Sequence, residues 1–410
     1  MPNITVVGAG FSGLATAYFL TKNGFKIRIT EKAARAGGLI KTIRTEHGLV
    51  ETAANGLVSS ARLEAMCADI GVPLTATRRE ARKRFIYRGK PKQLPLSVGE
   101  MVALSGRFAI NAARLRPRPL ETVSDWGRRV LGRGATDYLL IPALGGIYAG
   151  DPDRLSASLI FGKANLANHL HTNRPAKGKL RGTVSPPNGM QQLVDGLRDY
   201  LEGSGVEFMF SHDEKASADD AAIVCLPASS CASYLSDISP ELSDALRRIE
   251  MLSLATVTCF YGPDAAKLDG FGCLFPRDQK FRARGVLFNT SIFGERGPAH
   301  SETWIFGGAG DADVVDLSDK AFGEIIADER ARFYGASNEP LDVHVTRWPN
   351  ALPHYTVDLE NILTTLPPPP ENISLVGNYL GRIGLAKILE RAAVIADQVR
   401  TACSSGRASL

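Results

Sequence analysis

The sequence predicts a mixed α/β fold in which a domain with a parallel sheet carries a second domain with an antiparallel sheet and an inserted helical subdomain. Three patterns predict it. Residues 4–7 form an apolar strand that leads through a glycine turn into an apolar helix, which is typical of a parallel α/β unit. Strand patterns alternate with two helical stretches across residues 228–350, and a helical period covers residues 98–115.

The composition is that of an ordinary globular protein, with 44% hydrophobic and 22% charged residues in a chain of 410. This length suffices for two or three domains with substantial cores. The net charge of +5 suits anionic ligands or an anionic membrane surface. No basic stripe with interleaved aromatic residues is found, so we expect no nucleic-acid partner.

Neither a metal site nor a disulfide framework is expected. The six cysteines are scattered without C-x-x-C spacing, and the pair His169 and His171 lacks a convincing third ligand. The sequence shows no export signal at its start and no apolar run long enough to cross a membrane. We therefore expect a cytoplasmic protein.

The N-terminal unit predicts a Rossmann-like dinucleotide site. Gly8 permits a tight turn after the first strand, Gly10 lets the backbone approach a pyrophosphate, and Gly13 lets helix and strand pack closely. The helix N-terminus then presents free N–H groups to the phosphates. Glu31, at the end of the second strand, is placed to accept hydrogen bonds from the ribose hydroxyls.

The segment that follows identifies the dinucleotide. Glu31 is followed by a second glycine pair, and residues 6–38 together resemble the FAD-binding fingerprint of the superfamily of amine oxidases, phytoene desaturases and protoporphyrinogen oxidases. The resemblance implies FAD as the cofactor. It also implies that further residues of this stretch contact the cofactor, namely Phe11, Ser12, Lys32, Arg35, Gly37, Gly38 and Leu39, where Leu39 stands in place of the arginine of many members.

Two passages narrow the resemblance to protoporphyrinogen oxidases. Residues 145–156 read G-G-I-Y-A-G-D-P-D-R-L-S, and residues 84–95 read R-F-I-Y-R-G-K-P-K-Q-L-P. Both are similar to signatures of that family. The resemblance implies that Arg84 pairs with a substrate propionate and that Gly146 lies near a flat ligand, whereas composition alone favours a solvated edge strand around Arg84.

Between these passages the chain predicts alternating strands and helices. Residues 47–55 read as a strand and turn, and the resemblance places this backbone, including Asn55, beside the isoalloxazine, with Ala53 where the family has glycine. Residues 61–71 read as a short amphipathic helix. The basic helix at residues 98–115 either packs on a neighbour or lies on an anionic membrane, and the family's helical subdomain favours the membrane.

The middle third predicts the antiparallel sheet of a substrate domain. Strand patterns cover residues 255–261, 285–290, 304–307 and 343–348, and helical patterns cover residues 240–249 and 319–334. Residues 270–276 resemble the family's G-F-G-x-L-x-P passage. The resemblance implies that Phe271 and Leu274 sandwich a macrocycle and that Ile305 is another apolar wall residue, although such residues are commonly plain core.

The last segment is expected to complete the cofactor domain. Residues 373–376 read as a strand, and residues 381–400 read as a helix whose N-terminus points at the flavin. By resemblance the cofactor contacts here are Gly377, Asn378, Arg382, Ile383 and Gly384, with Arg382 where the family has glycine.

These patterns predict three units. Residues 1–77, 180–226 and 366–410 form the FAD-binding domain, residues 78–97 and 227–365 the substrate domain, and residues 98–179 the helical subdomain. The resemblance implies oxidation of a porphyrinogen, protoporphyrinogen IX or coproporphyrinogen III, by removal of six electrons with O2 as acceptor in haem biosynthesis. Alternatives are an amine oxidase or desaturase, and a non-catalytic binder of the guanine-nucleotide dissociation inhibitor type. A homodimer and peripheral contact with the inner face of the cell membrane are further expectations.

Overall fold

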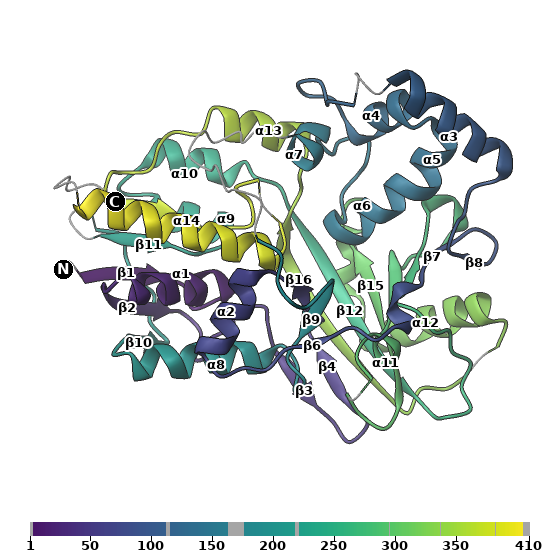
Figure 1. Ribbon diagram of the computed structural model, residues 1–410, viewed down its shortest axis with the longest axis horizontal. Coiled ribbons are helices and arrows are strands. Elements are labelled where there is room, and N and C mark those ends of the chain that lie inside the picture. The colour runs from purple at the N-terminus through teal and green to yellow at the C-terminus, as the bar shows by residue number, and fades with distance from the viewer. Residues whose placement is uncertain are drawn as a thin grey trace.

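The computed structural model describes residues 3–111, 115–162, 176–217, 221–294, 296–336, 338–381 and 383–404. Within these ranges the chain forms a parallel sheet flanked by helices, a larger mostly antiparallel sheet, and a further group of helices above the antiparallel sheet, at the upper right of Figure 1. The mixed α/β fold predicted from the sequence is confirmed.

The parallel sheet has five strands in the order β10-β2-β1-β11-β17. Alternate residues of β11 enter two different cores: Ile223 packs with α1, α2, α8 and α14, while Ala222 and Val224 pack with α9, α10 and α13. Helices therefore cover both faces, as expected for a parallel sheet. The strands are β10 (Glu207–Phe210), β2 (Lys26–Glu31), β1 (Asn3–Val7), β11 (Ala222–Val224) and β17 (Ile373–Leu375), and the helices are α1 (Phe11–Lys22), α2 (Ala61–Asp69), α8 (Gln191–Gly203), α9 (Ala228–Leu235), α10 (Pro240–Arg247), α13 (Val357–Thr364) and α14 (Leu385–Ser404).

Helix α1 begins and ends where its sequence predicts. Gly10 is the N-cap residue, and Asn23 caps the C-terminus before Gly24, whose φ of +84° suits glycine. Leu14 and Leu20 of α1 are fully buried against the sheet. Burial of such side chains contributes about 1.5–3 kcal/mol each, which holds the helix N-terminus in place above the strand ends.

The second sheet has seven strands in the order β16-β12-β15-β14-β13-β7-β8, and every pair is antiparallel except β7 with β13. One face is covered by α12 (Asp319–Tyr334) through an aromatic core that includes Trp304, Phe306 and Phe322. The strands are β7 (Arg84–Tyr87), β8 (Pro91–Lys92), β12 (Met251–Tyr261), β13 (Gly272–Leu274), β14 (Gly285–Phe288), β15 (His300–Gly307) and β16 (Asp342–Pro353).

Several boundaries differ from the sequence prediction: β12 begins at Met251, β15 begins at His300 and β16 extends to Pro353, so these strands are longer than predicted. The strand predicted over 285–290 ends at Phe288, because Asn289 begins the single turn α11 (Asn289–Ile292) and its amide bonds to Thr303 Oγ1 and Asn55. The helix predicted from residue 381 begins at Leu385, because Gly381 and Gly384 both have positive φ, which a helix does not accommodate.

The helical group contains α3 (Val98–Asn111), α4 (Val123–Val130), α5 (Arg133–Ala135), a π-helical turn (Thr136–Leu140), α6 (Ile141–Tyr148) and α7 (Ala157–Phe161). A polar contact ties it to the sheet: Arg88 after β7 makes two hydrogen bonds to Glu100 of α3 and stacks on the ring of Tyr138 at 3.7 Å. These hydrogen bonds from Arg88 lower the pKa of Glu100 to about 2. Small sheets pair β3 (Thr42–Arg44) with β4 (Leu49–Glu51), and β5 (Leu57–Val58) and β6 (Thr75–Ala76) with β9 (Thr183–Ser185).

Candidate functional site

A cavity of about 1000 Å³ lies at the carboxyl ends of β1, β2 and β11. This is where ligands bind in parallel α/β sheets, and the volume is at the upper end of small-molecule sites. Eleven of the seventeen residues predicted to contact a cofactor line it, namely Gly8, Gly10, Phe11, Ser12, Glu31, Lys32, Gly37, Gly38, Leu39, Gly377 and Asn378.

Glycines build the floor of this cavity. A Cβ on Gly13 would lie 1.8 Å from the Gly8 carbonyl oxygen, so only glycine lets α1 pack this closely on the turn. Gly10 and Gly38 face each other, since a Cβ on Gly38 would lie 3.2 Å from the Gly10 Cα. Side chains at either position would fill the space that a pyrophosphate needs, so the glycines keep the helix N-terminus open to an anion.

Glu31 and Arg35 form hydrogen bonds with the backbone around the cavity. The Glu31 carboxylate accepts hydrogen bonds from the backbone N–H groups of Ala9 and Ala33, at 2.8 and 2.9 Å. Carboxylate oxygens have further lone pairs, which remain for ribose hydroxyls. Arg35 does not line the cavity. Its guanidinium donates to the carbonyls of Ala36, Gly38 and Ile40, so it shapes the glycine loop from behind.

The remaining predicted cofactor contacts lie elsewhere. Gly13 is beneath the turn, Asn55 donates to Asn289 Oδ1 at 3.3 Å, and Ile383 and Gly384 precede α14 without lining the cavity. Arg382 lies outside the described residues, as do His169 and His171. Among the residues that are described, no group of three or more side chains could hold a metal ion.

Several lining residues were missed in the sequence. One set follows β10, from His212 to Ala216, and another lies after β11 and along α9; Leu385 and Ile388 come from the first turn of α14. The rule that ligands bind at the carboxyl ends of parallel strands could have identified the segment after β11. Its lining residues are Cys225, Leu226, Pro227, Ser230, Ser233, Tyr234 and Asp237.

The lining chemistry fits a dinucleotide. Thr30 lines the cavity and is 1% exposed, and its hydroxyl has no hydrogen-bond partner in the structure. A ligand that forms a hydrogen bond with this hydroxyl would satisfy it. Burial raises the pKa of the neighbouring Cys225 thiol to about 12, so this thiol stays neutral and is no nucleophile at pH 7. The cavity therefore offers donors, an acidic anchor and apolar walls, but no reactive thiolate.

The second part of the site is the face of the antiparallel sheet that α12 leaves uncovered. Strand register places Ile86, Leu274, Ile305 and Thr256 in one row across β7, β13, β15 and β12, with Gly285 of β14 between Leu274 and Ile305. Registered partners share a face of the sheet, and these four side chains are partly exposed although their sequence neighbours are mostly buried. The row forms a flat, largely apolar wall.

The predicted substrate residues meet at this wall. The Arg84 guanidinium lies 4.3 Å from the centroid of the Phe271 ring, two residues before Ile86 on the same strand face. A Cβ on Gly146 of α6 would lie 2.7 Å from Leu274, so glycine lets α6 approach the wall closely. Arg84, Gly146, Phe271, Leu274 and Ile305 are thus brought together; their contacts with a substrate stay predictions.

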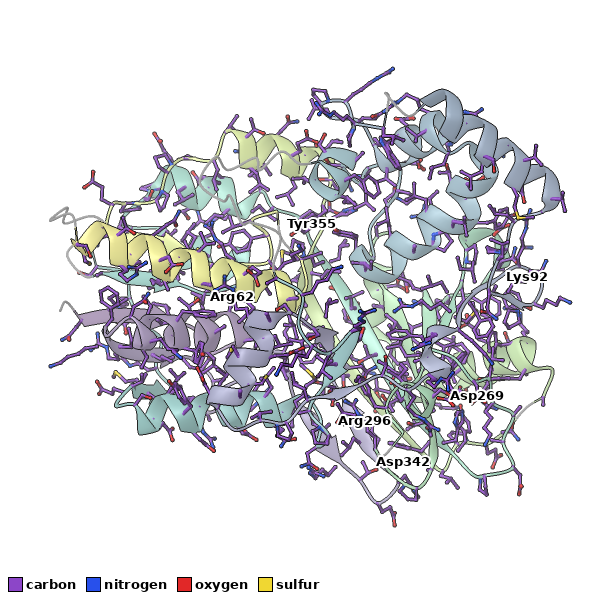
Figure 2. All side chains as sticks on the ribbon, viewed as in Figure 1. Arg62, Lys92, Asp269, Arg296, Asp342 and Tyr355 are labelled. Carbon is purple, nitrogen blue, oxygen red and sulfur yellow. The ribbon has the colours of Figure 1, made fainter. Side chains whose placement is uncertain are left out.

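A buried ion pair between Glu51 and Arg296 connects β4 to the segment before β15. Arg296, labelled in Figure 2, lies 3.5 Å from Glu51 at the end of β4 and stacks on Phe293. Burial raises the pKa of Glu51 and lowers that of Arg296, while their mutual attraction opposes both shifts. Arg296 also donates to Ser185 and to the Asn55 carbonyl, so the pair fixes β4, β9 and the turn at Asn55 relative to each other.

Comparison with known proteins agrees with this arrangement. The model of the family described as flavin containing amine oxidoreductase matches residues 11–386. A chloroplastic protoporphyrinogen oxidase of Nicotiana tabacum is 25% identical, over 96% of this chain and 84% of its own. A coproporphyrinogen III oxidase of Mycobacterium tuberculosis is also 25% identical, over 93% of each chain.

Solved structures share the fold. A provisionally named protoporphyrinogen oxidase from Exiguobacterium superposes with a TM-score of 0.77 at 19% identity, covering 98% of this chain and 99% of its own. Reduced UDP-galactopyranose mutase gives 0.76 at 14% identity, covering 97% and 94%. Because the family model spans most of the chain and the cavity carries the matching glycines and acid, this chain belongs to the flavin-containing amine oxidoreductases and is an enzyme with FAD as its cofactor.

Proposed function

We propose that this enzyme oxidises a porphyrinogen to the porphyrin, with protoporphyrinogen IX or coproporphyrinogen III as substrate and O2 as electron acceptor, as a step in haem biosynthesis. The observation that carries the proposal is the apolar row of Ile86, Leu274 and Ile305 with Arg84 at its edge. A porphyrinogen combines an apolar macrocycle with carboxylates on its rim, so it matches a flat wall with a guanidinium beside it.

The chain contributes binding and orientation to this reaction. The apolar row of the wall would contact the macrocycle, with Gly146 of α6 close to Leu274 at one end of the row, and Arg84 can grip a propionate with two parallel hydrogen bonds. Bound FAD supplies the two-electron oxidation, which three rounds would repeat to remove six electrons. Holding the reacting carbon beside the cofactor in a site with little water is the part that falls to the protein.

The relatives named above support both substrates, since one carries the name of a protoporphyrinogen oxidase and another that of a coproporphyrinogen III oxidase. The test is to purify the protein, record its visible spectrum for bound FAD, and follow porphyrin fluorescence with each porphyrinogen under air. Formation of either porphyrin supports the proposal. A yellow protein that forms no porphyrin would direct attention to amines and other apolar donors instead.

We also propose that the enzyme is cytoplasmic and contacts the inner face of the cell membrane through α3. Three apolar side chains near the start of this helix are strongly exposed: Leu94 by 54%, Val98 by 73% and Val102 by 68%. Arg107 is less available for headgroups than the sequence suggested, because it donates to carbonyls at the end of α4. No described helix is both long and apolar enough to cross a membrane.

Cosedimentation tests the membrane proposal. Binding to anionic vesicles at low salt, weakened by salt and by Val98→Ser together with Val102→Ser, supports it. Equal recovery of wild type and double variant in the supernatant contradicts it. Assembly into a homodimer stays a prediction that gel filtration can decide.

A further inference from the structure

Thr52 connects the cofactor cavity to the antiparallel sheet. It follows β4, is 3% exposed, and its backbone N–H donates to the Lys41 carbonyl at 3.0 Å. Its hydroxyl lies 3.0 Å from both the Leu39 and Lys41 carbonyls. Since Leu39 lines the cavity, Thr52 fixes the backbone that forms this edge of the cofactor site.

The carbonyl of Thr52 is held from the other side. It accepts one hydrogen bond from Thr256 Oγ1 at 3.0 Å and another from Trp348 Nε1 at 2.8 Å. Thr256 belongs to β12 and Trp348 to β16, so both donors come from the antiparallel sheet. Two side chains therefore saturate the two lone pairs of one buried carbonyl.

The hydrogen bonds that join Thr52 to Leu39, Thr256 and Trp348 are called the node below, and they lie beside the proposed substrate wall. Thr256 is in register with Ile305 and Thr346, so it belongs to the apolar wall. Ala351, three residues after Trp348 on β16, lines the cavity together with Leu39. The hydrogen bonds of Thr52 therefore connect a lining residue of the cavity, Leu39, to a strand of the wall, β12.

We propose that Thr52 and Trp348 are positioning residues that set the distance and angle between the bound cofactor and the substrate wall. The inference rests on the proposed function. A hydrogen-bonded node at this place fixes Leu39 relative to Ile305, because Thr52 bonds to the backbone on one side and to the wall strands on the other. Misplacement by about 1 Å can cost about 100-fold in rate, so small relaxations here are measurable.

The variants remove single hydrogen bonds and keep shape. Trp348→Phe removes the indole N–H, and Thr52→Val removes the hydroxyl while leaving a β-branched side chain. Matched controls break equivalent bonds far from the cavity: Trp126→Phe loses a bond from its indole to the Leu115 carbonyl at 3.0 Å, and Thr364→Val loses a bond to the Glu360 carbonyl at 2.7 Å.

Three readouts separate positioning from stability. Titration of the apoprotein with FAD should give dissociation constants within about threefold of wild type, because the glycines and Glu31 are intact. The visible circular dichroism of bound FAD should change in Trp348→Phe and Thr52→Val and stay as wild type in both controls. With a porphyrinogen, kcat should fall about tenfold in the two node variants with little change in KM, as the loss of one hydrogen bond implies.

A double variant tests whether the two residues act as one unit. If they do, Trp348→Phe with Thr52→Val should lower kcat about as much as the stronger single change rather than by the product of both. The inference is overturned if the node variants bind FAD and match the controls in circular dichroism and kcat, or if all four variants lose kcat alike. Failure of wild-type protein to bind FAD or form porphyrin would instead refute the proposed function.

Discussion

Removing the Arg84 guanidinium tests the substrate site most sharply. Arg84 is exposed, stacks on Phe271 at 4.3 Å, and has no ion-pair partner among the described residues. It can therefore bind a carboxylate without first breaking a salt bridge. A charge-assisted hydrogen bond contributes about 1.5–3 kcal/mol, so Arg84→Ala should lower kcat/KM about 10- to 150-fold.

The kinetic constants say how the contact acts. If Arg84 only anchors the bound substrate, KM should rise while kcat holds; if it also orients the reacting carbon, kcat should fall as well. Arg84→Lys should recover part of the loss, because lysine keeps the charge but not the planar fork. Lys83→Ala is the matched control, since Lys83 is an exposed cation immediately before β7. Wild-type kinetics in Arg84→Ala with FAD bound would refute the reasoning.

Three further changes probe the ring under Arg84, the buried acid of α12 and the glycine floor. Phe271→Leu should raise KM about two- to fivefold through the lost cation–π contact, and should raise KM less in an Arg84→Ala background, which a double-mutant cycle measures. Burial raises the pKa of Glu329 to about 7, so the wild type should lose stability as pH rises from about 4.5 to about 7. Glu329→Gln cannot ionise, so its melting temperature relative to that of the wild type should be higher at pH 8 than at pH 5. An equal difference at both pH values would contradict this. Gly38 and Gly205 have φ of +58° and +84°, so alanine at either should cost about 1–2 kcal/mol of stability, measured by denaturant unfolding, but only Gly38→Ala should weaken FAD binding.

The cofactor half of the site could be predicted from the sequence because its constraints are local. Gly8, Gly13 and Glu31 act through a turn, a close helix–strand contact and a strand end, which lie within one βαβ unit. The spacing of these residues in the sequence is therefore enough to predict this local structure. The same holds for α1 and for α12, whose caps at Ser318 and Gly335 coincide with the predicted ends.

The rest depends on contacts between distant segments. Asn55 donates a hydrogen bond to Asn289, 234 residues later, and β14 ends just before Asn289. The contact of Asn55 with the flavin stays a prediction. The node at Thr52 joins β4 to Trp348, 296 residues away, and nothing in either local sequence signals it. The apolar wall itself is visible only once strand register aligns Leu274 with Gly285 and Ile305.

The central claim is that this enzyme oxidises porphyrinogens with its bound FAD, and a single-turnover experiment without air tests it most directly. FAD-loaded protein is mixed with one equivalent of protoporphyrinogen IX or coproporphyrinogen III while flavin absorbance is followed. We predict that the yellow absorbance bleaches with at least one of the two, and that admitting O2 restores it as porphyrin fluorescence appears. An unchanged spectrum with both porphyrinogens, together with bleaching by a simple amine such as putrescine, would contradict the account.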